Sequence, residues 1–283
     1  MGNGALIKGG SKLGAGSLLG VQSTSPKDVP PHTSWFGAPP LEFPRLPQAG
    51  DPMRTVAPRK RLVIGRALAE IVRIVVPTTA SMAIAISVFA GLDAVGRAWG
   101  PWTMAALAPA LLLAGGVSAV SVTAVAKWAL MGRYRPENHP LWSWFVWRDE
   151  IVNSCQEVLA GVWLLDSASA SPIMNLYLRL MGTKVGRDVW CDTMTITEFD
   201  VVRLGDGCAI NRNACIETHL FQDRIMSIGP TDIGANTTVG PSSVVLPDTR
   251  LGEGACVGGR SVVLRGEELP AHTRWHGAPV VSM

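Results

Sequence analysis

The sequence predicts a left-handed parallel β-helix of hexapeptide repeats combined with a two-span transmembrane α-helical hairpin. Three observations predict this fold class. An apolar residue recurs every six positions near the C-terminus, two long stretches lack any charged residue, and one segment near the N-terminus recurs near the C-terminus. The composition agrees, since only 17% of the 283 residues are charged and the mean hydropathy is +0.24, which is unusual for an ordinary soluble domain.

Apolar residues recur at intervals of six from Leu204 onward, and the series resumes one residue out of phase at Ile233. The positions are Leu204, Ile210, Ile216, Ile228, Ile233, Val239, Val245, Leu251, Val257 and Val263. Neither a helix nor a strand has a period of six, whereas a triangular β-helix coil of three hexads turns one such residue inward on each face. We therefore expect residues 183–283 to form a hexapeptide-repeat β-helix with a C-terminal cap.

The segment ETHLFQDRIMS, between Ile216 and Ile228, does not follow this series, because the next inward position falls on the polar residue Gln222. It is predicted to be a loop that leaves the solenoid. Loops held by a rigid scaffold often carry function. This loop contains His219.

Residues 74–92 and 102–126 contain no charged side chain, and each stretch can cross a hydrocarbon core of about 30 Å. Basic residues flank the outer ends of the pair, at Arg59, Lys60, Arg61, Arg66, Arg73, Lys127, Arg133 and Arg135, whereas residues 93–101 contain one acid and one base. The positive-inside rule then predicts a multi-pass cell-membrane protein with both termini and the β-helix in the cytoplasm. A buried hairpin of a soluble protein is the alternative.

The segment PPHTSWFGAPP, residues 30–40, recurs as PAHTRWHGAPV at residues 270–280, and LGAGSLLG from Leu13 parallels LGEGACVG from Leu251. Since Ile7, Leu13 and Leu19 also have the spacing of six, residues 1–46 are expected to be the C-terminal end of a preceding β-helix copy. One coil cannot bury a core alone. We therefore expect either a C-terminal fragment of a longer polypeptide or a start codon assigned inside a reading frame.

The remaining segments connect these parts. Residues 47–73 are predicted to be a basic linker rich in Pro and Arg. Residues 127–182 contain several tryptophans among mixed charged and apolar residues, which predicts helices that either lie at the membrane interface or pack within the protein.

The cysteine pattern and the charge exclude several classes of function. The five cysteines are widely spaced, without a Cys-x-x-Cys pair or a nearby His at zinc-ligand spacing, so we predict no disulfide framework and no metal site. Cys208, Cys215 and Cys256 are expected to be small residues inside the coils. A net charge of +3 without a basic run interleaved with aromatic residues argues against binding of nucleic acid.

Several motifs together are similar to one family. They are LGAGSLLG with PPHTSWFGAPP, HPLWSWF from His139, YLRLMGTKVG from Tyr177, THLFQDR from Thr218 and GEELPAHTRWHGAP from Gly266. In these motifs the chain resembles the C-terminal region of membrane-bound nonribosomal peptide synthetases of the ε-poly-L-lysine synthetase type. The resemblance implies upstream adenylation and carrier domains, followed by membrane helices interleaved with three tandem acyltransferase-like β-helices that join aminoacyl units into an amino-acid homopolymer.

The resemblance also implies the partners and the acyl donor. The partners are the membrane, an aminoacyl carrier domain, an adenylation domain and further β-helix copies or subunits. The donor is an aminoacyl group on the phosphopantetheine of the carrier, with no cofactor bound covalently to this chain. The chain departs from the family pattern because it has neither an adenylation core nor a carrier-type Ser in a recognisable setting. It is therefore not expected to activate amino acids alone.

Amide formation from an aminoacyl thioester needs a base for the acceptor amine and donors for the developing oxyanion. His219 is the candidate base, with Glu217 or Asp223 to orient its ring. Arg224 and Asn211 complete the candidate catalytic set, the latter as an amide donor. In the alternative interpretation, His219 only links the loop to Asp223 or Arg224.

Other polar residues fit structural roles. Asn211 and its neighbour Asn213 could belong to an ordinary asparagine ladder in the β-helix turns. His32 and His272 lie in the repeated Pro-x-His-Thr-x-Trp segment. Its prolines and glycine indicate a chain reversal that caps the solenoid.

Two further classes of function stay open at this stage. One is a stand-alone acyl-CoA-dependent transferase that acts on a sugar or an amine at the membrane and holds coenzyme A between adjacent β-helices. The other is a noncatalytic scaffold, in which the β-helix only holds synthetase domains at the bilayer.

Overall fold

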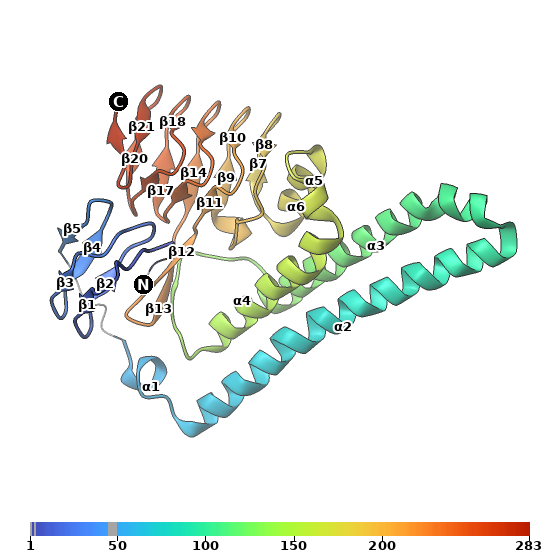
Figure 1. Cartoon of the computed structure of the whole chain (residues 1–283), viewed down its shortest axis with the longest axis horizontal. Helices are drawn as coiled ribbons and strands as arrows, with labels where there is room; N and C mark the ends of the chain where they lie inside the picture. Colours follow the sequence, from blue (N-terminus) through green and yellow to red (C-terminus); the bar gives the residue numbers. More distant parts are fainter. Residues whose placement is uncertain (1, 3, 45–49) are drawn as a thin grey trace.

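The computed structural model describes residue 2, residues 4–44 and residues 50–283 (Figure 1). It contains a small N-terminal β segment, a long helical hairpin with shorter helices beside it, and a C-terminal stack of parallel coils. The N-terminal segment consists of β1 (Lys12–Leu13), β2 (Leu18–Leu19), β3 (Asp28–Val29), β4 (Ser34–Phe36) and β5 (Leu41–Phe43). In Figure 1 these strands lie beside the last coils of the stack.

The C-terminal stack is a parallel β-helix with three faces. The first face contains β7 (Lys184–Val185), β9 (Val202–Leu204), β14 (Thr231–Ile233), β17 (Thr249–Leu251) and β20 (Glu268–Leu269). The second contains β8 (Trp190–Cys191), β10 (Ala209–Ile210), β15 (Thr238–Val239), β18 (Cys256–Val257) and β21 (Arg274–His276), with β22 (Val281–Ser282) added antiparallel to β21. The third contains β11 (Cys215–Ile216), β16 (Val244–Val245) and β19 (Val262–Val263).

The inward residues of successive coils stack in register. Leu204, Ile233 and Leu251 are partners on the first face, and each is at most 1% exposed. Full burial of such a side chain stabilises a fold by roughly 1.5–3 kcal/mol. The series of six therefore predicts the inward positions, with one correction. Ile228 is buried, but it lies on β13 (Ile225–Ile228) of an antiparallel hairpin and not on a coil.

The segment that leaves the solenoid is an ordered β-hairpin. Strand β12 (His219–Gln222) pairs antiparallel with β13, and β6 (Asn138–Pro140) adds a third strand beside β13. Asp223 and Arg224 form the tight turn, with φ of 50° and 63°. Positive φ at both central residues is the geometry that suits the twist of a two-residue hairpin.

Two long helices form the hairpin, and shorter helices follow. The helices are α1 (Pro52–Thr55), α2 (Lys60–Trp99), α3 (Pro101–Leu130), α4 (Trp144–Cys155), the π-helix η1 (Gln156–Leu165), α5 (Asp166–Ala168), α6 (Pro172–Met181) and the short 3₁₀-helix η2 (Phe199–Val201). By length and composition, α2 and α3 can cross a membrane. Only 11% and 17% of their most apolar windows are buried.

The predicted linker is largely structured where it is described. Its residues 47–49 lie outside the described residues. Residues 60–73 form the first turns of α2, because no proline interrupts the chain between Lys60 and Arg73. The predicted spans 74–92 and 102–126 lie within α2 and α3.

Helix α4 and η1 run along the α2–α3 hairpin. The Trp163 indole N–H donates to Ser81 Oγ at 2.9 Å, and its ring packs against Gly115, where a Cβ would lie 3.1 Å from the ring. Near the other end, Arg66 on α2 pairs with Glu150 on α4. Helix α4 and η1 thus contact the α2–α3 hairpin along much of their length.

A buried ion pair joins the hairpin to the β-helix. The Lys127 side chain on α3 is fully buried, and its Nζ lies 2.7 Å from Asp200 Oδ2 in η2. Asp200 also accepts the backbone N–H of Tyr134 at 3.1 Å. Since an unpaired buried charge is costly, the pair holds α3 at a fixed position against the first coils.

The N-terminal β segment docks on the third face of the β-helix. Phe36 packs with Val244, Leu246 and Val262, the Gln22 amide donates to Ser242 O at 3.0 Å, and Ala38 N–H donates to the carbonyl of Ala278. Leu19 is buried in this segment. The earlier expected inward residues, Ile7 and Leu13, are 44% and 43% exposed.

Removal of the buried lysine charge tests the link between hairpin and β-helix. We expect Lys127→Met to lower the free energy of unfolding by about 3–5 kcal/mol, because Asp200 would stay buried without its cationic partner. The double variant Lys127→Met/Asp200→Asn should recover much of this loss. Denaturant unfolding of the detergent-solubilised chain measures both, and equal losses in the single and double variants would contradict the explanation.

Candidate functional site

His219 and Glu198 form a hydrogen-bonded pair where two neighbouring coils leave the regular path. Ile196 forms a β-bridge with Ile216 in the next coil. Glu198 lies two residues after Ile196, and His219 lies three residues after Ile216. His219 Nδ1 lies 3.0 Å from Glu198 Oε2. The His219 side chain is 16% exposed and that of Glu198 is fully buried.

Glu198 is held from several sides. Its Oε2 accepts hydrogen bonds from the hydroxyl groups of Thr197, at 2.7 Å, and Thr218. Its backbone is left-handed, with φ of 33° and ψ of 54°. A non-glycine residue in this region is strained, and such residues cluster at functional sites. Glu198 Oε1 is buried and has no hydrogen-bond partner among the residues that the structure describes.

The pair forms an ion pair at neutral pH. Burial by itself would lower the pKa of His219, but the negative charge and hydrogen bond of Glu198, with the charges of Glu217 and Asp149, raise this pKa to about 9. Burial would likewise raise the pKa of Glu198, but the charge of His219 and the hydrogen bonds from His219, Thr218 and Thr197 lower it. A protonated imidazole therefore faces an ionised carboxylate.

Helix α4 places a second carboxyl group near this pair. Asp149 is 2% exposed and accepts the Tyr134 hydroxyl at 2.8 Å and the Asn153 amide at 3.2 Å. Burial, together with the charge of Glu198, raises the pKa of Asp149 to about 8. Asp149 is thus largely protonated at neutral pH, and Glu198 carries the negative charge next to His219.

Glu217 lies on the other side of the histidine ring. Its Oε1 is 3.9 Å from His219 Nε2, and its Oε2 accepts the Cys215 thiol at 3.0 Å. The structure therefore brings Glu217 near His219, as the sequence analysis expected. The carboxylate within hydrogen-bond distance of the ring is nevertheless Glu198.

Asp223, Arg224 and Asn211 have other positions. Asp223 and Arg224 occupy the hairpin turn, at the end of β12 opposite to His219. The Arg224 guanidinium donates to the carbonyl of Thr55 at 3.2 Å. The Asn211 amide donates to Val239 O in the next coil, at 2.8 Å. The structure gives Arg224 and Asn211 contacts within the fold and places neither against the His219–Glu198 pair.

The remaining polar residues of the sequence analysis occupy turns. Asn213, His32 and His272 have φ of 58°, 60° and 58°. The rings of His32 and His272 lie over Gly16 and Gly254 of the neighbouring turn. Among the described residues, no group of three His, Cys, Asp or Glu side chains is arranged to hold a metal ion.

Sequence reasoning missed Glu198 and Asp149. A signal for Glu198 exists, because Ile196 and Leu204 are eight residues apart where the series requires six. Extension of the series upstream of Leu204 would have marked residues 197–203 as a second departure from the coil. Asp149 has no comparable signal, since an acid between Arg148 and Glu150 in a mixed helix resembles many exposed residues.

A groove of about 410 Å³ opens beside the β12–β13 hairpin. Its walls come from the N-terminal segment, from β12 and from the last coils, and include Leu18, Trp35, Phe36, Leu220, Phe221, Gln222, Leu264 and Arg265. His219 does not line this groove, but its ring packs edge-on against that of Phe221, with 5.4 Å between centroids. The side chain of Phe221 therefore separates the groove from the histidine.

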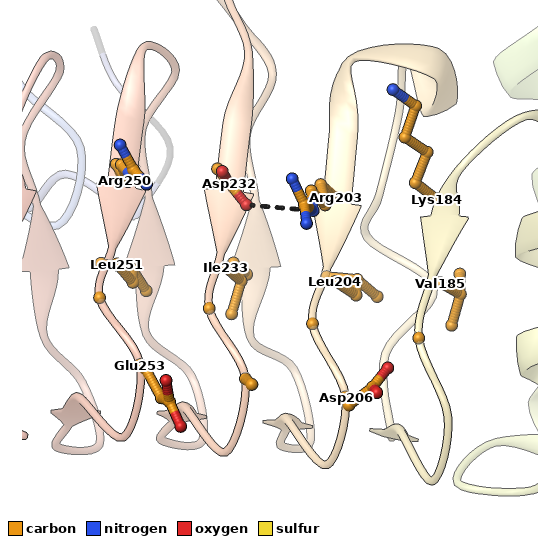
Figure 2. Close-up of a pocket in the computed structure, with 15 residues that line it drawn as sticks. Lys184, Val185, Arg203, Leu204, Asp206, Asp232, Ile233, Arg250, Leu251 and Glu253 are labelled. Atoms are coloured by element: carbon orange, nitrogen blue, oxygen red, sulfur yellow. Dashed lines mark ion pairs between the residues drawn. The ribbon is translucent and has the colours of Figure 1, made fainter. Parts of the chain in front are cut away.

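A second hollow, of about 760 Å³, follows the first face of the β-helix. Figure 2 shows Lys184, Arg203, Asp232 and Arg250 in a row across successive strands, with the ion pair between Arg203 and Asp232 marked at 3.9 Å. Asp206 and Glu253 lie at the turns. These side chains form a solvated charged surface, and no residue of the His219 cluster lines it.

Comparison with known proteins agrees with the coil geometry. Residues 230–265 match the profile of bacterial transferase hexapeptide (six repeats). Such repeats form a left-handed β-helix, as the sequence analysis predicted.

Two curated proteins are similar to the chain. It is 35% identical over 288 residues to delta-poly-L-ornithine synthetase of Acinetobacter baumannii (strain AB307-0294), with 99% of this chain and 21% of that protein covered. It is 26% identical over 140 residues to a Schizosaccharomyces pombe (strain 972) protein whose name assigns it only provisionally to the acetyltransferases, with 46% of this chain and 67% of that protein covered. The chain spans about a fifth of the length of the synthetase that it matches.

Solved structures of hexapeptide-repeat enzymes also match. Neisseria gonorrhoeae serine acetyltransferase is 15% identical, with a TM-score of 0.36 over 71% of this chain and 66% of that chain. A Vibrio cholerae hexapeptide-repeat acetyltransferase is 16% identical, with a TM-score of 0.31 over 40% of this chain and 78% of that chain. Both TM-scores are below 0.5, and neither similarity bears on the activity of this chain.

Neutralisation of Glu198 tests the electrostatics of the pair. Glu198→Gln should lower the pKa of His219 from about 9, because it removes the carboxylate charge and the charge-assisted hydrogen bond that raise this pKa against the effect of burial. NMR titration of the histidine ring protons measures this change. Glu217→Gln should lower the pKa less, since its carboxylate lies farther from the ring.

The same pair predicts a pH dependence of stability. The folded-state pKa of His219 lies above the unfolded value of 6.5, so its stabilising contribution is complete below pH 6.5 and is lost as the pH rises through about 9. In Glu198→Gln this loss between pH 6.5 and 9 should vanish from denaturant unfolding curves. An unchanged slope would show that other groups cause it.

Proposed function

We propose that this chain is the acyltransferase-like, amide-bond-forming region of a membrane-bound synthetase that polymerises amino acids. The observation that carries the proposal is the His219–Glu198 pair, whose histidine begins β12, the strand that supplies Phe221 to the wall of an apolar groove. The similarity to a poly-ornithine synthetase along 99% of this chain supports the reaction class.

The proposed reaction transfers an aminoacyl group from a thioester to an amine. The amine nitrogen attacks the carbonyl carbon, the carbon–sulfur bond breaks, and a thiol and an amide are formed. Neutral His219 accepts the proton of the amine at Nε2, while its Nδ1–H donates to Glu198, which fixes the tautomer and stabilises the imidazolium that forms. The imidazolium then gives this proton to the leaving thiolate, which restores neutral His219. The aminoacyl-phosphopantetheine of a carrier domain is the proposed donor.

The groove beside Phe221 is the proposed approach for the donor. Its walls are mainly apolar, and Arg265 and Gln222 provide polar groups. A narrow, largely apolar donor arm fits such a groove, because most small-molecule sites combine apolar walls with a few polar groups. Since the N-terminal β segment forms one wall, the donor site depends on the contact between this segment and the β-helix.

The α2–α3 hairpin is proposed to insert in the cell membrane, with the β-helix and both termini on the cytoplasmic side. Ile86 and Phe89 on α2 are 62% and 71% exposed, which is unfavourable in water for a helix pair of this length. The ion pair of Asp93 with Arg97 and the exposed Trp99 and Trp102 lie at the tip. Tryptophan prefers the membrane–water interface, so the tip suits the far side of a bilayer.

A second candidate function is acyl transfer from acyl-coenzyme A. The match of residues 230–265 to bacterial transferase hexapeptide repeats favours it. The two candidates differ in the donor that they require. A purified chain that uses acetyl-coenzyme A but no aminoacyl thioester would support the second candidate.

Replacement of the proposed base tests the reaction. With a panel of aminoacyl-pantetheine thioesters and an amine acceptor, we expect His219→Gln in detergent-solubilised protein to lower the rate of amide formation by 10²–10⁴-fold, the usual contribution of a general base. Arg274→Ala, on an exposed strand at the far end of the β-helix, is the matched control. Full activity of His219→Gln would remove this residue from the mechanism.

The pH dependence provides a further test. With a pKa of about 9, His219 is neutral in about one molecule in a hundred at pH 7. With methoxyamine, an acceptor that stays neutral over the range, kcat/KM should rise about tenfold per pH unit between pH 7 and 8 and level off near 9. In Glu198→Gln this rise should move to lower pH, and a profile without any rise would contradict base catalysis by His219.

A further inference from the structure

Helix α6 has an apolar face that stays largely exposed in the part of the chain that the structure describes. Its inner face is buried against the first coils through Met174, Leu178 and Met181, each at most 1% exposed. On the opposite side, Ile173, Leu176 and Leu180 are 42%, 66% and 46% exposed. Spacings of three and four residues put these three side chains in one stripe along the helix.

The position of α6 indicates what covers this stripe. Figure 1 shows α6 at the end of the β-helix formed by β7 and β8, between these strands and the part of the hairpin that extends beyond the other helices. Because the inner face of α6 packs toward the coils, its outer face is turned away from them. The projecting part of the hairpin extends to the same side.

Direct contacts connect α6 with α3. The Trp128 indole N–H, on α3, donates to the carbonyl of Leu180 at 2.9 Å, and Trp128 is itself 41% exposed. On the other edge of α6, Trp190 lines a hollow together with Pro172 and Asn175 and is 51% exposed. The stripe is thus flanked by two exposed tryptophans, the residue type that favours the region of lipid headgroups.

Helix α6 meets the helical hairpin near the end of the predicted span 102–126, where Trp128 bonds to Leu180. Trp163 contacts Ser81 and Gly115, so η1 packs along the α2–α3 hairpin as far as these two residues. The chain then continues through α5 to α6. Beyond this level α2 and α3 continue with exposed apolar side chains, such as Phe89 and Leu113, which are 71% and 54% exposed. A bilayer that covers the predicted span as far as residue 126 would reach the level of α6, because Leu180 lies against Trp128.

We propose that the outer face of α6 rests on the surface of the bilayer in which the hairpin inserts, so that the first coil of the β-helix stands on the membrane. This inference rests on the proposed membrane insertion of α2 and α3. Its occupant is the lipid surface, because the stripe is short, lies on an amphipathic helix and stands next to Trp128 at the end of the predicted span.

One consequence concerns the candidate site. Glu198 follows the first coil and His219 follows the second. Since successive coils are about 4.8 Å apart, the pair would lie within about 10 Å of α6 along the axis of the β-helix. Amide formation would then take place close to the membrane surface, where a membrane-held carrier and product are concentrated.

Site-specific fluorescence tests the contact with lipid. Leu176→Cys, labelled with an environment-sensitive fluorophore and reconstituted in phosphatidylcholine–phosphatidylglycerol vesicles, should lose at least half of its emission when lipids with a quencher near the headgroup are included. Arg274→Cys at the far end of the β-helix is the matched exposed control and should not change. Phe89→Cys, on the projecting hairpin, reports insertion of α2. For this label, the vesicles contain lipids that carry the quencher deeper in the acyl chain.

The outcomes separate the two proposals. Quenching at both Leu176 and Phe89 supports the contact of α6 with the bilayer. Quenching at Phe89 without quenching at Leu176 overturns this contact and leaves the inserted hairpin intact. If neither label is quenched, the hairpin does not insert, and the proposal for α6 fails with it. The unsubstituted protein contains five buried or half-buried cysteines. Its fluorescence after the same labelling reaction gives the background signal.

Discussion

The structure depends on one constraint, the burial of one apolar side chain per face in every coil of the β-helix. Each inward residue stacks on the equivalent residue of the next coil, so that Ile210, Val239 and Val257 form a continuous column. Because a residue that breaks the spacing cannot point inward, extra residues must leave the coil at its corners. The coils thereby determine where irregular segments are allowed.

Two such departures from neighbouring coils create the candidate site. Residues after Ile196 and after Ile216 leave at the same corner, which brings Glu198 and Thr218 into contact. Glu198 is then enclosed and held in a left-handed conformation, and His219 begins the hairpin beside it. The rigidity of the coils keeps the pair in place, as a catalytic or binding pair requires.

The helices complete the surroundings of the candidate site. Asp149 and Tyr134 enclose the His219–Glu198 pair from the side of α4, and the ion pair of Lys127 with Asp200 holds α3 next to the first coils. The same helices lead to α6, which covers the end of the β-helix with Met174 and Met181. The candidate site is therefore built at the junction of two architectures, and motion of the helices relative to the coils would disturb its electrostatics.

The sequence by itself determined the β-helix, the helical hairpin and the loop that carries His219, because periodicity and the absence of charge are local properties that can be read from spacing. Only the tertiary structure decided the partner of His219. Glu217 and Asp223 are near it in sequence, whereas Glu198 is 21 residues away and reaches it through the stacking of two coils. Distance along the chain says little about such a contact, because each coil returns the chain to the same corner.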